Sequence, residues 1–470
     1  MDAAYIFAKD LVTVKYGDIP RDAVEATKKH ILDFLGVALA GSSKAGVKEL
    51  QGIVADWGGK RESTVLCYGD KIPAPNAAQV NASMGHALDY DDVGTGGHSA
   101  VVIVPTCLAV AERKGNVSGR EFITAVILGV EIMCRMGFSL ALGLSRNKPV
   151  AGEPGAGEPY GGWHSTPLHG FIAAAGVTGR MLGLDEEGVL NAIGIAYHQC
   201  AGNGQCVIEG ALTKRMGPGF AAKGGITAAL MAEKGITGVK NSLEGKDGLF
   251  NLYHRGRYDA KALKVRLAER FDGINVAIKP YPCCAGTHSH INAALKLVNK
   301  HDIKAGDVKE ITIIDCDPNN VLLFPLEARS HPENVVDSQF SIPWGVAVAI
   351  ARRRVAIGDF TEEAIKSRDI LNIADKISAE LDPALARPGG TIVGRVKILT
   401  NSGKTYTEES GGTLGGLRDP LSYAECAAKF RDCASYSVKK LSGKDIEKVI
   451  ELVGNLEEIA DVNEIVARLS

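Results

Sequence analysis

The stretch 21-RDAVEATKKHILDFLGVALAG-41 shows most clearly which secondary structure the first half of the chain adopts. Its apolar face recurs every three or four residues, at Val24, Thr27, Ile31, Leu35 and Ala38. That spacing is typical of one side of an α-helix, and the run closes at a glycine, a common residue at a helix end. The stretch therefore predicts a long helix with one buried face.

Similar helical runs follow through the rest of the first half. They lie at 101–115, 120–137, 170–183, 185–199 and 219–235. Each run is rich in alanine and glycine and has little side-chain bulk. The distance between packed helices depends on the side chains at the contact, and small side chains allow a short distance. These runs therefore predict a compact bundle in which the helix backbones lie close together.

The pattern changes near residue 270. Strand-like runs appear at 308-VKEITIIDC-316, 390-GTIVGRVKILTNSG-403 and 405-TYTEES-410. The step Asn401-Ser402-Gly403 between the last two is a hairpin signal. Helical runs at 343–354 and 361–378 separate the first strand from the hairpin, and from 420–438 onward the chain is again helical.

The predicted fold class is therefore mainly α with an α+β second domain. A chain of 470 residues exceeds the size that one core usually supports. We expect a helical domain over 1–270, an α+β lid domain over 271–412, and a C-terminal return to the helical domain over 413–470. The loop 145-SRNKPVAGEPGAGEPYGGW-163 is too rich in Gly and Pro for regular structure, and its length suggests a function.

Composition narrows the functional classes. Lys plus Arg (53) nearly balances Asp plus Glu (55), so no bulk charge recruits nucleic acid or an anionic membrane. The most apolar run, 123-ITAVILGVEIMC-134, is shorter than a membrane span and contains Glu131, which predicts a buried helix. The acidic N-terminus is not expected to be a secretory signal. The ten scattered cysteines predict reduced, mostly buried thiols and a cytoplasmic protein.

The segment 86-HALDYDDVGTGGH-98 is the first candidate site. If 81–93 is a helix, Asp89 and Asp92 share a face with His86, and Asp91 points elsewhere. His86, Asp89 and His98 have the ligand types of a zinc site, but their spacing matches no dedicated metal motif. Acidic residues at a helix C-terminus oppose the helix dipole. Such a conflict is expected at functional sites, although an inert polar helix end is the alternative.

Two further clusters carry basic groups. In 163-WHSTPLHG-170, His164 can act as an acid or base, and Ser165 or Thr166 can cap the following helix. An inert loop histidine is the alternative. In 211-ALTKRMGPGFAAKGG-225, Lys214 and Arg215 precede a Gly-Pro-Gly step that is expected to start a helix. Two cations beside a helix N-terminus make a carboxylate site, and the alternative is a solvated surface pair.

The fourth cluster, 279-KPYPCCAGTHSH-290, lies at the proposed domain junction. Its prolines fix the backbone and project Lys279 and Cys284 from a rigid loop. A nucleophilic cysteine needs an activating base, and His288 lies four residues after Cys284. No dinucleotide fingerprint, P-loop or GxSxG elbow is present, so nicotinamide, flavin, ATP and serine-hydrolase chemistry have little support.

Together these motifs resemble the MmgE/PrpD family, which includes 2-methylcitrate dehydratase, cis-aconitate decarboxylase and iminodisuccinate epimerase. The resemblance spans essentially the whole chain. The matching segments are LDFLGVALAG (32–41), HALDYDD (86–92) with His98, GWHST (162–166), TKRMGPGFAAKGG (213–225), EGKDGLF (244–250), KPYPCC (279–284) and FSIPWGVAVAI (340–350).

The resemblance implies a site in the cleft between a helical domain and a smaller α+β lid. It also implies a homodimer, small polycarboxylate substrates, and no metal or organic cofactor. The implied catalytic residues are Asp89, His98, His164, Lys214 and Lys279. The residues expected to line the substrate pocket are Asp92, Arg215, Cys284 and Trp344.

Three positions depart from the pattern of the decarboxylase branch. Val93 stands in place of a threonine, Cys284 in place of a histidine, and Trp344 in place of a tyrosine. Thr95 is a candidate to supply the missing threonine hydroxyl. These losses favour dehydration of a 2-methylcitrate-like hydroxy acid over decarboxylation. Epimerisation of a dicarboxylate, decarboxylation, and a non-catalytic carboxylate-binding protein remain the alternatives.

Overall fold

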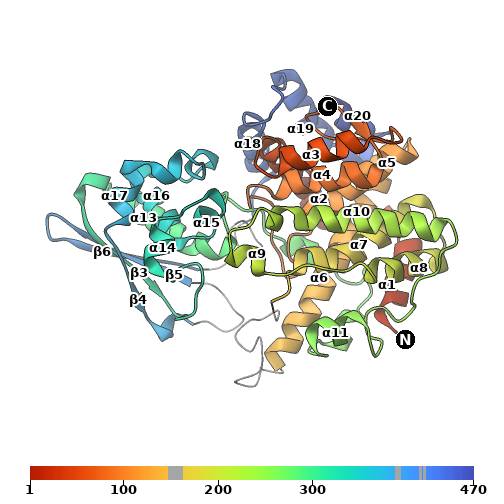
Figure 1. Ribbon diagram of the computed structural model, residues 1–470, viewed down its shortest axis with the longest axis horizontal. Coiled ribbons are helices and arrows are strands. Elements are labelled where there is room, and N and C mark those ends of the chain that lie inside the picture. Colours follow the sequence, from red (N-terminus) through yellow and green to blue (C-terminus); the bar gives the residue numbers. More distant parts are fainter. Residues whose placement is uncertain (147–161, 387–392, 412–414, 416–419) are drawn as a thin grey trace.

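The computed structural model describes residues 1–146, 162–386, 393–411, 415 and 420–470. The chain forms a large helical body and a smaller α+β lobe, which lie side by side (Figure 1). The expected fold class is confirmed: helices dominate, and a small mixed sheet lies in the smaller lobe. Most of the 145–163 loop lies outside the described residues.

The helical body contains the long helices predicted from the sequence. Its elements before the smaller lobe are α1 (Ala3–Thr13), α2 (Arg21–Gly41), α3 (Val47–Trp57), α4 (Ala74–His86), α5 (Ala100–Lys114), α6 (Gly119–Arg146), α7 (Ser165–Leu182), α8 (Glu186–Tyr197), α9 (Gln205–Ile208), α10 (Thr213–Glu233), α11 (Leu249–His254) and α12 (Ala260–Leu263), with a short ribbon of β1 (Ser63–Thr64) and β2 (Lys71–Ile72). The return comprises α18 (Tyr423–Ala434), α19 (Gly443–Gly454) and α20 (Asn463–Arg468).

Small residues bring these helices together, as predicted. Helix α10 packs against α4, α7 and α8. A Cβ built at Gly219 of α10 would lie 2.5 Å from the carbonyl oxygen of Gln79 in α4, so only glycine fits there. One correction concerns the start of α10: it begins at Thr213, and Pro218 lies inside it. Lys214 and Arg215 therefore occupy its first turn and do not precede it.

The smaller lobe is built on a four-stranded sheet with the order β4-β3-β5-β6. Strands β3 (Val308–Asp315), β5 (Val393–Thr400) and β6 (Thr405–Gly411) are antiparallel neighbours, and the predicted hairpin joins β5 to β6. The run 361–378 is not one helix: α17 (Arg368–Ala374) ends early, and β4 (Ile377–Leu381) pairs parallel with β3. The lobe also contains α13 (His288–Lys300), α14 (Leu326–Ser330), α15 (Val335–Gln339) and α16 (Ile342–Arg352).

The two largest apolar cores follow this division into lobes. One apolar cluster joins buried residues from Ala3 to Ile278 with those from Cys426 to Leu469, and a second lies between Cys283 and Ile398. The predicted boundaries at 270 and 412 remain predictions. The ten cysteines are free thiols, most of them buried, as expected.

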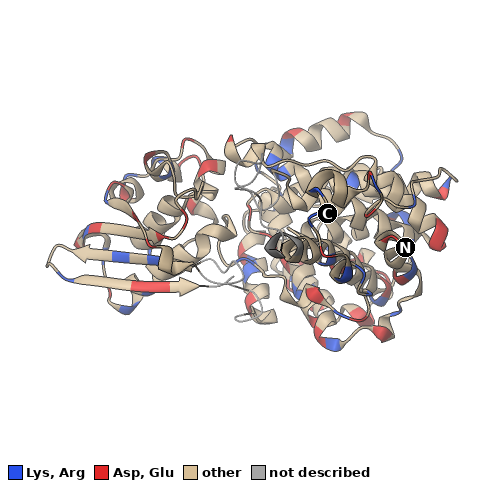
Figure 2. Ribbon diagram, turned by 90° about the horizontal axis from the view of Figure 1, so that it is seen from below, with Lys and Arg blue, Asp and Glu red and all other residues tan. Residues whose placement is uncertain are grey.

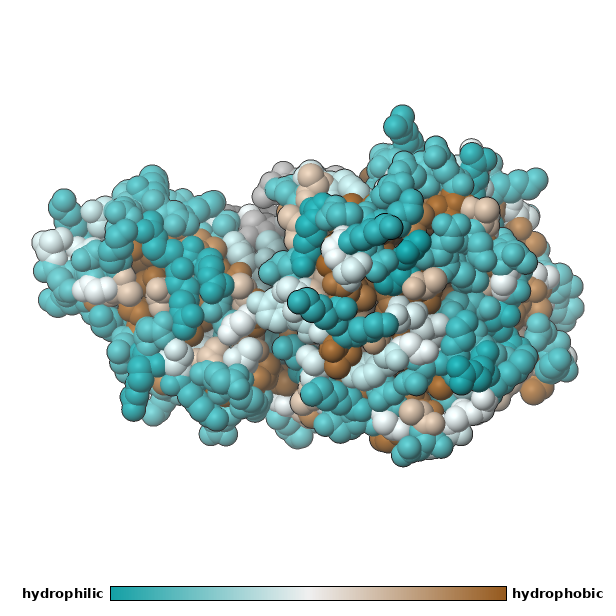
Figure 3. Space-filling view, turned by 90° about the horizontal axis from the view of Figure 1, so that it is seen from above, coloured by the Kyte–Doolittle hydropathy of each residue, from teal (hydrophilic) through white to brown (hydrophobic). Residues whose placement is uncertain are grey.

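Helix α6 is longer than its sequence pattern predicted. Its segment Gly119–Leu142 is long and apolar enough to cross a membrane, but 83% of its most apolar window is buried inside the fold. Basic and acidic residues are scattered over both lobes (Figure 2). The visible face in Figure 3 is mostly hydrophilic, with scattered apolar spots.

Candidate active site

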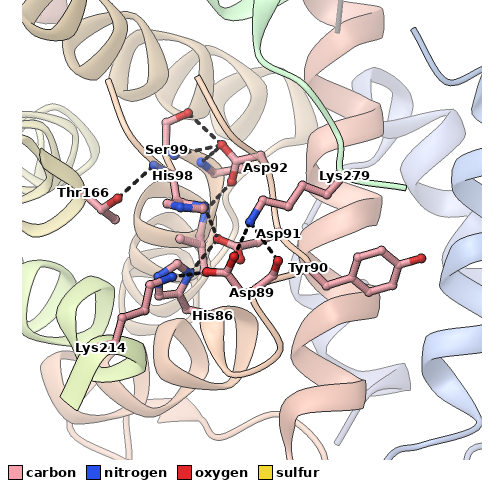
Figure 4. Close-up of polar contacts among 12 residues, drawn as sticks. His86, Asp89, Tyr90, Asp91, Asp92, His98, Ser99, Thr166, Lys214 and Lys279 are labelled. Carbon is pink, nitrogen blue, oxygen red and sulfur yellow. Dashed lines mark hydrogen bonds and ion pairs between the residues drawn. The ribbon is translucent and has the colours of Figure 1, made fainter. Parts of the chain in front are cut away.

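The candidate site begins where α4 ends. The predicted helix over 81–93 is wrong beyond His86, which is the last residue of α4. Asp89 then adopts φ 50°, a left-handed conformation that aspartate tolerates better than most residues. Because the chain leaves the helical path here, helical spacing no longer decides which acidic side chains point together. Figure 4 shows the result.

A short antiparallel backbone pair brings the distant Lys279 to this loop. Val93 donates to the carbonyl of Ala277 (2.8 Å) and accepts from its N–H (2.9 Å). The Lys279 ammonium then donates to Asp89 twice, to Oδ2 (2.7 Å) and to the backbone oxygen (2.8 Å). Lys214, from the first turn of α10, forms an ion pair with Asp89 Oδ1. One carboxylate therefore holds two ammonium groups (Figure 4).

Burial and charge oppose each other at this ion pair. Burial alone would raise the pKa of Asp89, but Lys214 and Lys279 outweigh it and hold that pKa well below its ordinary value. Burial would likewise lower the pKa of Lys279, but the charge of Asp89 outweighs it, so the pKa is raised. Asp89 and Lys279 thus stay ionised around neutral pH, although each is at most 3% exposed.

Asp91 links two imidazoles. Its Oδ2 lies 2.8 Å from Nδ1 of His86 and 3.0 Å from Nδ1 of His98. Burial favours the neutral acid, but the two imidazoles outweigh it and hold the pKa of Asp91 well below its ordinary value. Burial lowers the pKa of His86 to about 4, so this ring is neutral at neutral pH. We assign the Nδ1 hydrogen of His86 as the donor, since an ionised carboxylate only accepts, whereas His98 lies at ion-pair distance.

This arrangement corrects one sequence-based expectation. Asp91 was expected to point away from the site, but it lies between His86 and His98, and Asp89 contacts the two lysines.

His164 faces the same region from the residue before α7. Its ring lies 6.3 Å from that of His86, nearly parallel to it at 24°. Burial, followed by the charge of Lys214, holds the pKa of His164 well below its ordinary value, so its imidazole is neutral. A pocket of about 350 Å³ is lined by His164 and Lys214 together with Pro167, Phe171, Asn203 and Phe220. Neither Ser165 nor Thr166 is the cap of α7, and Thr166 Oγ1 accepts from the His98 N–H (3.0 Å).

The imidazole pair also has the ligand types of a metal site. His86, Asp91 and His98 each offer one ligand atom, and these atoms lie within 4.8 Å of one another. A bound cation would displace the hydrogen bond of His86 Nδ1 to Asp91 and would face the charge of Lys214, which contributes to the low pKa of His86.

The four residues expected to line the substrate pocket have different surroundings. Asp92 accepts four hydrogen bonds at the start of α5, from Ser99 N, Ser99 Oγ, Ala100 N and Val101 N, so it caps that helix. Trp344 is 0% exposed, and its indole N–H donates to the Asp359 carbonyl (3.2 Å) inside the smaller core. Neither side chain is available to a ligand in this arrangement.

Cys284 and Arg215 flank the ion pair of Asp89. The backbone N–H of Cys284 donates to Gln339 O (2.8 Å), and its side chain is half-buried. His288 does not activate it, because Nε2 of His288 lies against the carbonyl of Cys283 (3.1 Å). Arg215 donates to the Ala45 carbonyl (2.9 Å), away from the imidazoles. Thr95 is exposed in the turn that follows Val93.

Sequence reasoning missed a lysine that supports this site. Lys429 of α18 donates to the carbonyls of Tyr90 (2.7 Å) and Lys279 (2.9 Å), and it forms an ion pair with Asp33 (2.6 Å). It therefore fixes the two loops that supply Asp89 and Lys279. The only sequence signal is a charge on the otherwise apolar face of α18, whose other buried residues include Cys426, Phe430 and Cys433.

Comparison with known proteins places these motifs in a family. Residues 6–260 match the model of the MmgE/PrpD N-terminal domain, and residues 281–455 match that of the MmgE/PrpD C-terminal domain. A cis-aconitate decarboxylase-like protein of Aspergillus oryzae is 26% identical over 479 residues, covering 97% of this chain and 95% of the relative.

Two further relatives are similar over the same length. The cis-aconitate decarboxylase of Aspergillus terreus is 25% identical over 474 residues, covering 96% of this chain and 93% of the relative. The cis-aconitate decarboxylase of Homo sapiens is 26% identical over 466 residues, covering 97% of this chain and 92% of the relative. The similarity therefore extends over both lobes of the fold.

Proposed function

The chain belongs to the MmgE/PrpD family, and we propose that it is a lyase that removes a proton from the carbon next to a carboxylate of a small di- or tricarboxylate. The observation that carries this proposal is the pair of ammonium groups on Asp89 beside the His86–Asp91–His98 chain. The two ammonium groups can bind and neutralise substrate carboxylates, and the histidine–aspartate chain can move a proton.

The lysines keep free hydrogen-bond donors for a substrate. An ammonium group has three N–H donors. In the described contacts Lys279 uses two of them on Asp89, and Lys214 uses one. The remaining donors can hold a substrate carboxylate and stabilise the negative charge that develops on it when the adjacent carbon loses its proton. Asp89 keeps the two cations close together without neutralising both.

His98 is the base that we propose. Its Nδ1 lies 3.0 Å from the ionised Asp91, so the charge that His98 gains on taking a proton at Nε2 is stabilised by the carboxylate behind the ring. Its side chain is 13% exposed, whereas that of His86 is 0% exposed, so His98 is the ring that a ligand can reach.

A second proton-transfer group favours dehydration. Loss of water requires a base for the carbon-bound proton and a donor for the departing hydroxyl, whereas loss of CO2 requires only delivery of a proton to carbon. Lys214 and the neutral His164 both line the 350 Å³ pocket, and the Lys214 ammonium can give a proton to a departing hydroxyl there. We therefore propose dehydration of a 2-methylcitrate-like hydroxy acid as the reaction.

Decarboxylation is the second candidate because three relatives named above are cis-aconitate decarboxylases or resemble one. Val93 and Cys284 still depart from the pattern of that branch. Trp344 is a weaker argument than its sequence position suggested, since its side chain lies in the core of the smaller lobe.

One experiment separates these reactions. The protein is incubated in D2O with a panel of hydroxy-tricarboxylates, unsaturated tricarboxylates and dicarboxylates, and the products are followed by NMR. Dehydration gives a new alkene signal, and decarboxylation gives a product with one carboxylate fewer and deuterium on carbon. Epimerisation gives deuterated substrate of inverted configuration. Saturable binding without turnover on any compound would instead indicate a carboxylate-binding protein and contradict the proposal.

We also propose that the protein is a homodimer. Helices α3 and α10 expose large apolar side chains, including Ile53, Trp57, Phe220 and Met231. Light scattering coupled to size-exclusion chromatography tests this: a mass of twice 49.6 kDa is expected, and a mass of 49.6 kDa contradicts it.

A further inference from the structure

Arg215 is a buried cation without a carboxylate partner. It is 5% exposed, and Nη1 donates to the carbonyl of Ala45. Within the described ranges, every other buried lysine or arginine has a carboxylate within 4.0 Å: Lys28, Arg135, Lys214, Lys279 and Lys429. Taking an unpaired charge out of water is costly. The position of Arg215 therefore calls for an anion that the chain itself does not supply.

Arg215 lines a pocket with room for such an anion. The pocket has a volume of about 480 Å³ and lies between the two lobes, with Lys44 as its second cation. Burial, followed by the charge of Arg215, lowers the pKa of Lys44, as expected for two cations that share one space. Glu362 and Glu363 also line the pocket, but both are exposed; the charge of Glu363 acts on Lys44, although the two form no ion pair within 4.0 Å.

The rest of the wall is largely apolar. It is formed by Leu88, Leu212, Val335, Val336 and Phe360. Two cations beside an apolar wall suit a carboxylate on a hydrocarbon body, because the apolar part gains free energy on leaving water. The exposed carboxylates of Glu362 and Glu363 disfavour a ligand that carries a second negative charge near the rim of the pocket.

We propose that this pocket binds a small organic acid, with its carboxylate between Arg215 and Lys44 and its hydrocarbon part against Leu88 and Phe360. The pocket differs from the 350 Å³ pocket beside His164. It lies next to the ion pair along the chain, since Leu88 directly precedes Asp89 and Arg215 directly follows Lys214. This inference does not rest on the proposed lyase activity.

Isothermal titration calorimetry with straight-chain carboxylates from butyrate to octanoate tests the site, with the corresponding amides as uncharged controls. Each added methylene is expected to tighten binding roughly four-fold until the pocket is full. Arg215→Met is expected to weaken binding about 10- to 100-fold, since it removes a charge-assisted hydrogen bond. Lys44→Met is expected to weaken it about ten-fold.

The matched control is Lys48→Met, which removes an exposed lysine of α3 that does not line the pocket. It is expected to leave the affinity unchanged. Absence of saturable binding, equal binding of the amides, or equal effects of Lys44→Met and Lys48→Met would overturn the proposal. If Arg215→Met does not fold, the comparison between the two lysine variants decides.

The carboxylate has two possible sources, and the lyase assay distinguishes them. If it belongs to a remote part of the substrate, octanoate raises KM and leaves kcat unchanged. If it belongs to a second molecule, octanoate changes kcat at saturating substrate. Either result upholds the site. Failure of every lyase assay would leave the calorimetric result unaffected, so the two proposals can fail separately.

Discussion

Asp91→Asn is the sharpest test of the acid–base arrangement. In the wild type, one carboxylate oxygen accepts from Nδ1 of His86 (2.8 Å) and lies 3.0 Å from Nδ1 of His98. Asparagine keeps the shape and one acceptor oxygen but loses the negative charge. Asp91 is 1% exposed, so water screens this interaction little.

The magnitude follows from the charge of Asp91, 3.0 Å from His98. A buried charged contact of this kind contributes about 1.5–3 kcal/mol, which corresponds to a decrease in kcat of roughly 10- to 150-fold if it is realised only when His98 takes the proton. KM should change little, because Asp91 lies behind the imidazole and does not face the substrate.

Steady-state kinetics of Asp91→Asn and Asp92→Asn provide the assay and its matched control. Asp92 caps α5, and loss of a cap costs about 0.5–2 kcal/mol, so this neighbour should lower Tm and leave kcat almost unchanged. A kcat of Asp91→Asn within about three-fold of the wild type refutes the reasoning, as does an equal loss of kcat in both variants.

Three further predictions concern Lys279, Lys429 and His169, a buried histidine of α7. Lys279→Met removes two hydrogen bonds to Asp89 and one donor for the substrate, so kcat/KM should fall by at least about 100-fold, whereas equal kcat/KM would remove Lys279 from the site. Lys429→Met frees the carbonyls of Tyr90 and Lys279; kcat should fall about ten-fold and Tm should also fall, and unchanged kinetics would show that the two loops hold their positions without it. Burial lowers the pKa of His169 to about 4, so its protonation favours the unfolded chain and stability is lost as pH falls below 6.5. The loss should reach about 2 kcal/mol at pH 5, and urea unfolding of His169→Gln should lack that share of the pH dependence.

Much of the fold followed from local pattern. Helix α2 begins and ends at the predicted residues because its apolar spacing and its closing glycine agree. Strand β4 was missed because Ile377–Leu381 is short and follows a helix directly, and only its pairing with β3 makes it a strand. The start of α10 was placed too late because Pro218 suggested a beginning, although the structure accommodates it inside the helix.

The sequence predicted which residues belong to the site but not how their side chains are arranged. Lys214 and Lys279 were identified as cations next to small residues or prolines in the sequence. The resemblance to the family then implied that both belong to one site. Their convergence on Asp89 depends on the left-handed turn at that residue and on the backbone pair of Val93 with Ala277. Neither has a periodic signal. A helical projection therefore selected Asp92 and rejected Asp91, although Asp91 is the residue that holds both imidazoles.

The central claim is that the cations on Asp89 promote proton removal from a polycarboxylate, and Lys214→Ala tests it most directly. The measurement is kcat/KM for the wild type and this variant with the polycarboxylate that gives turnover in D2O, with circular dichroism to verify the fold. The account predicts that Lys214→Ala folds normally and has no detectable turnover. A folded Lys214→Ala protein with near-wild-type kcat/KM would contradict it.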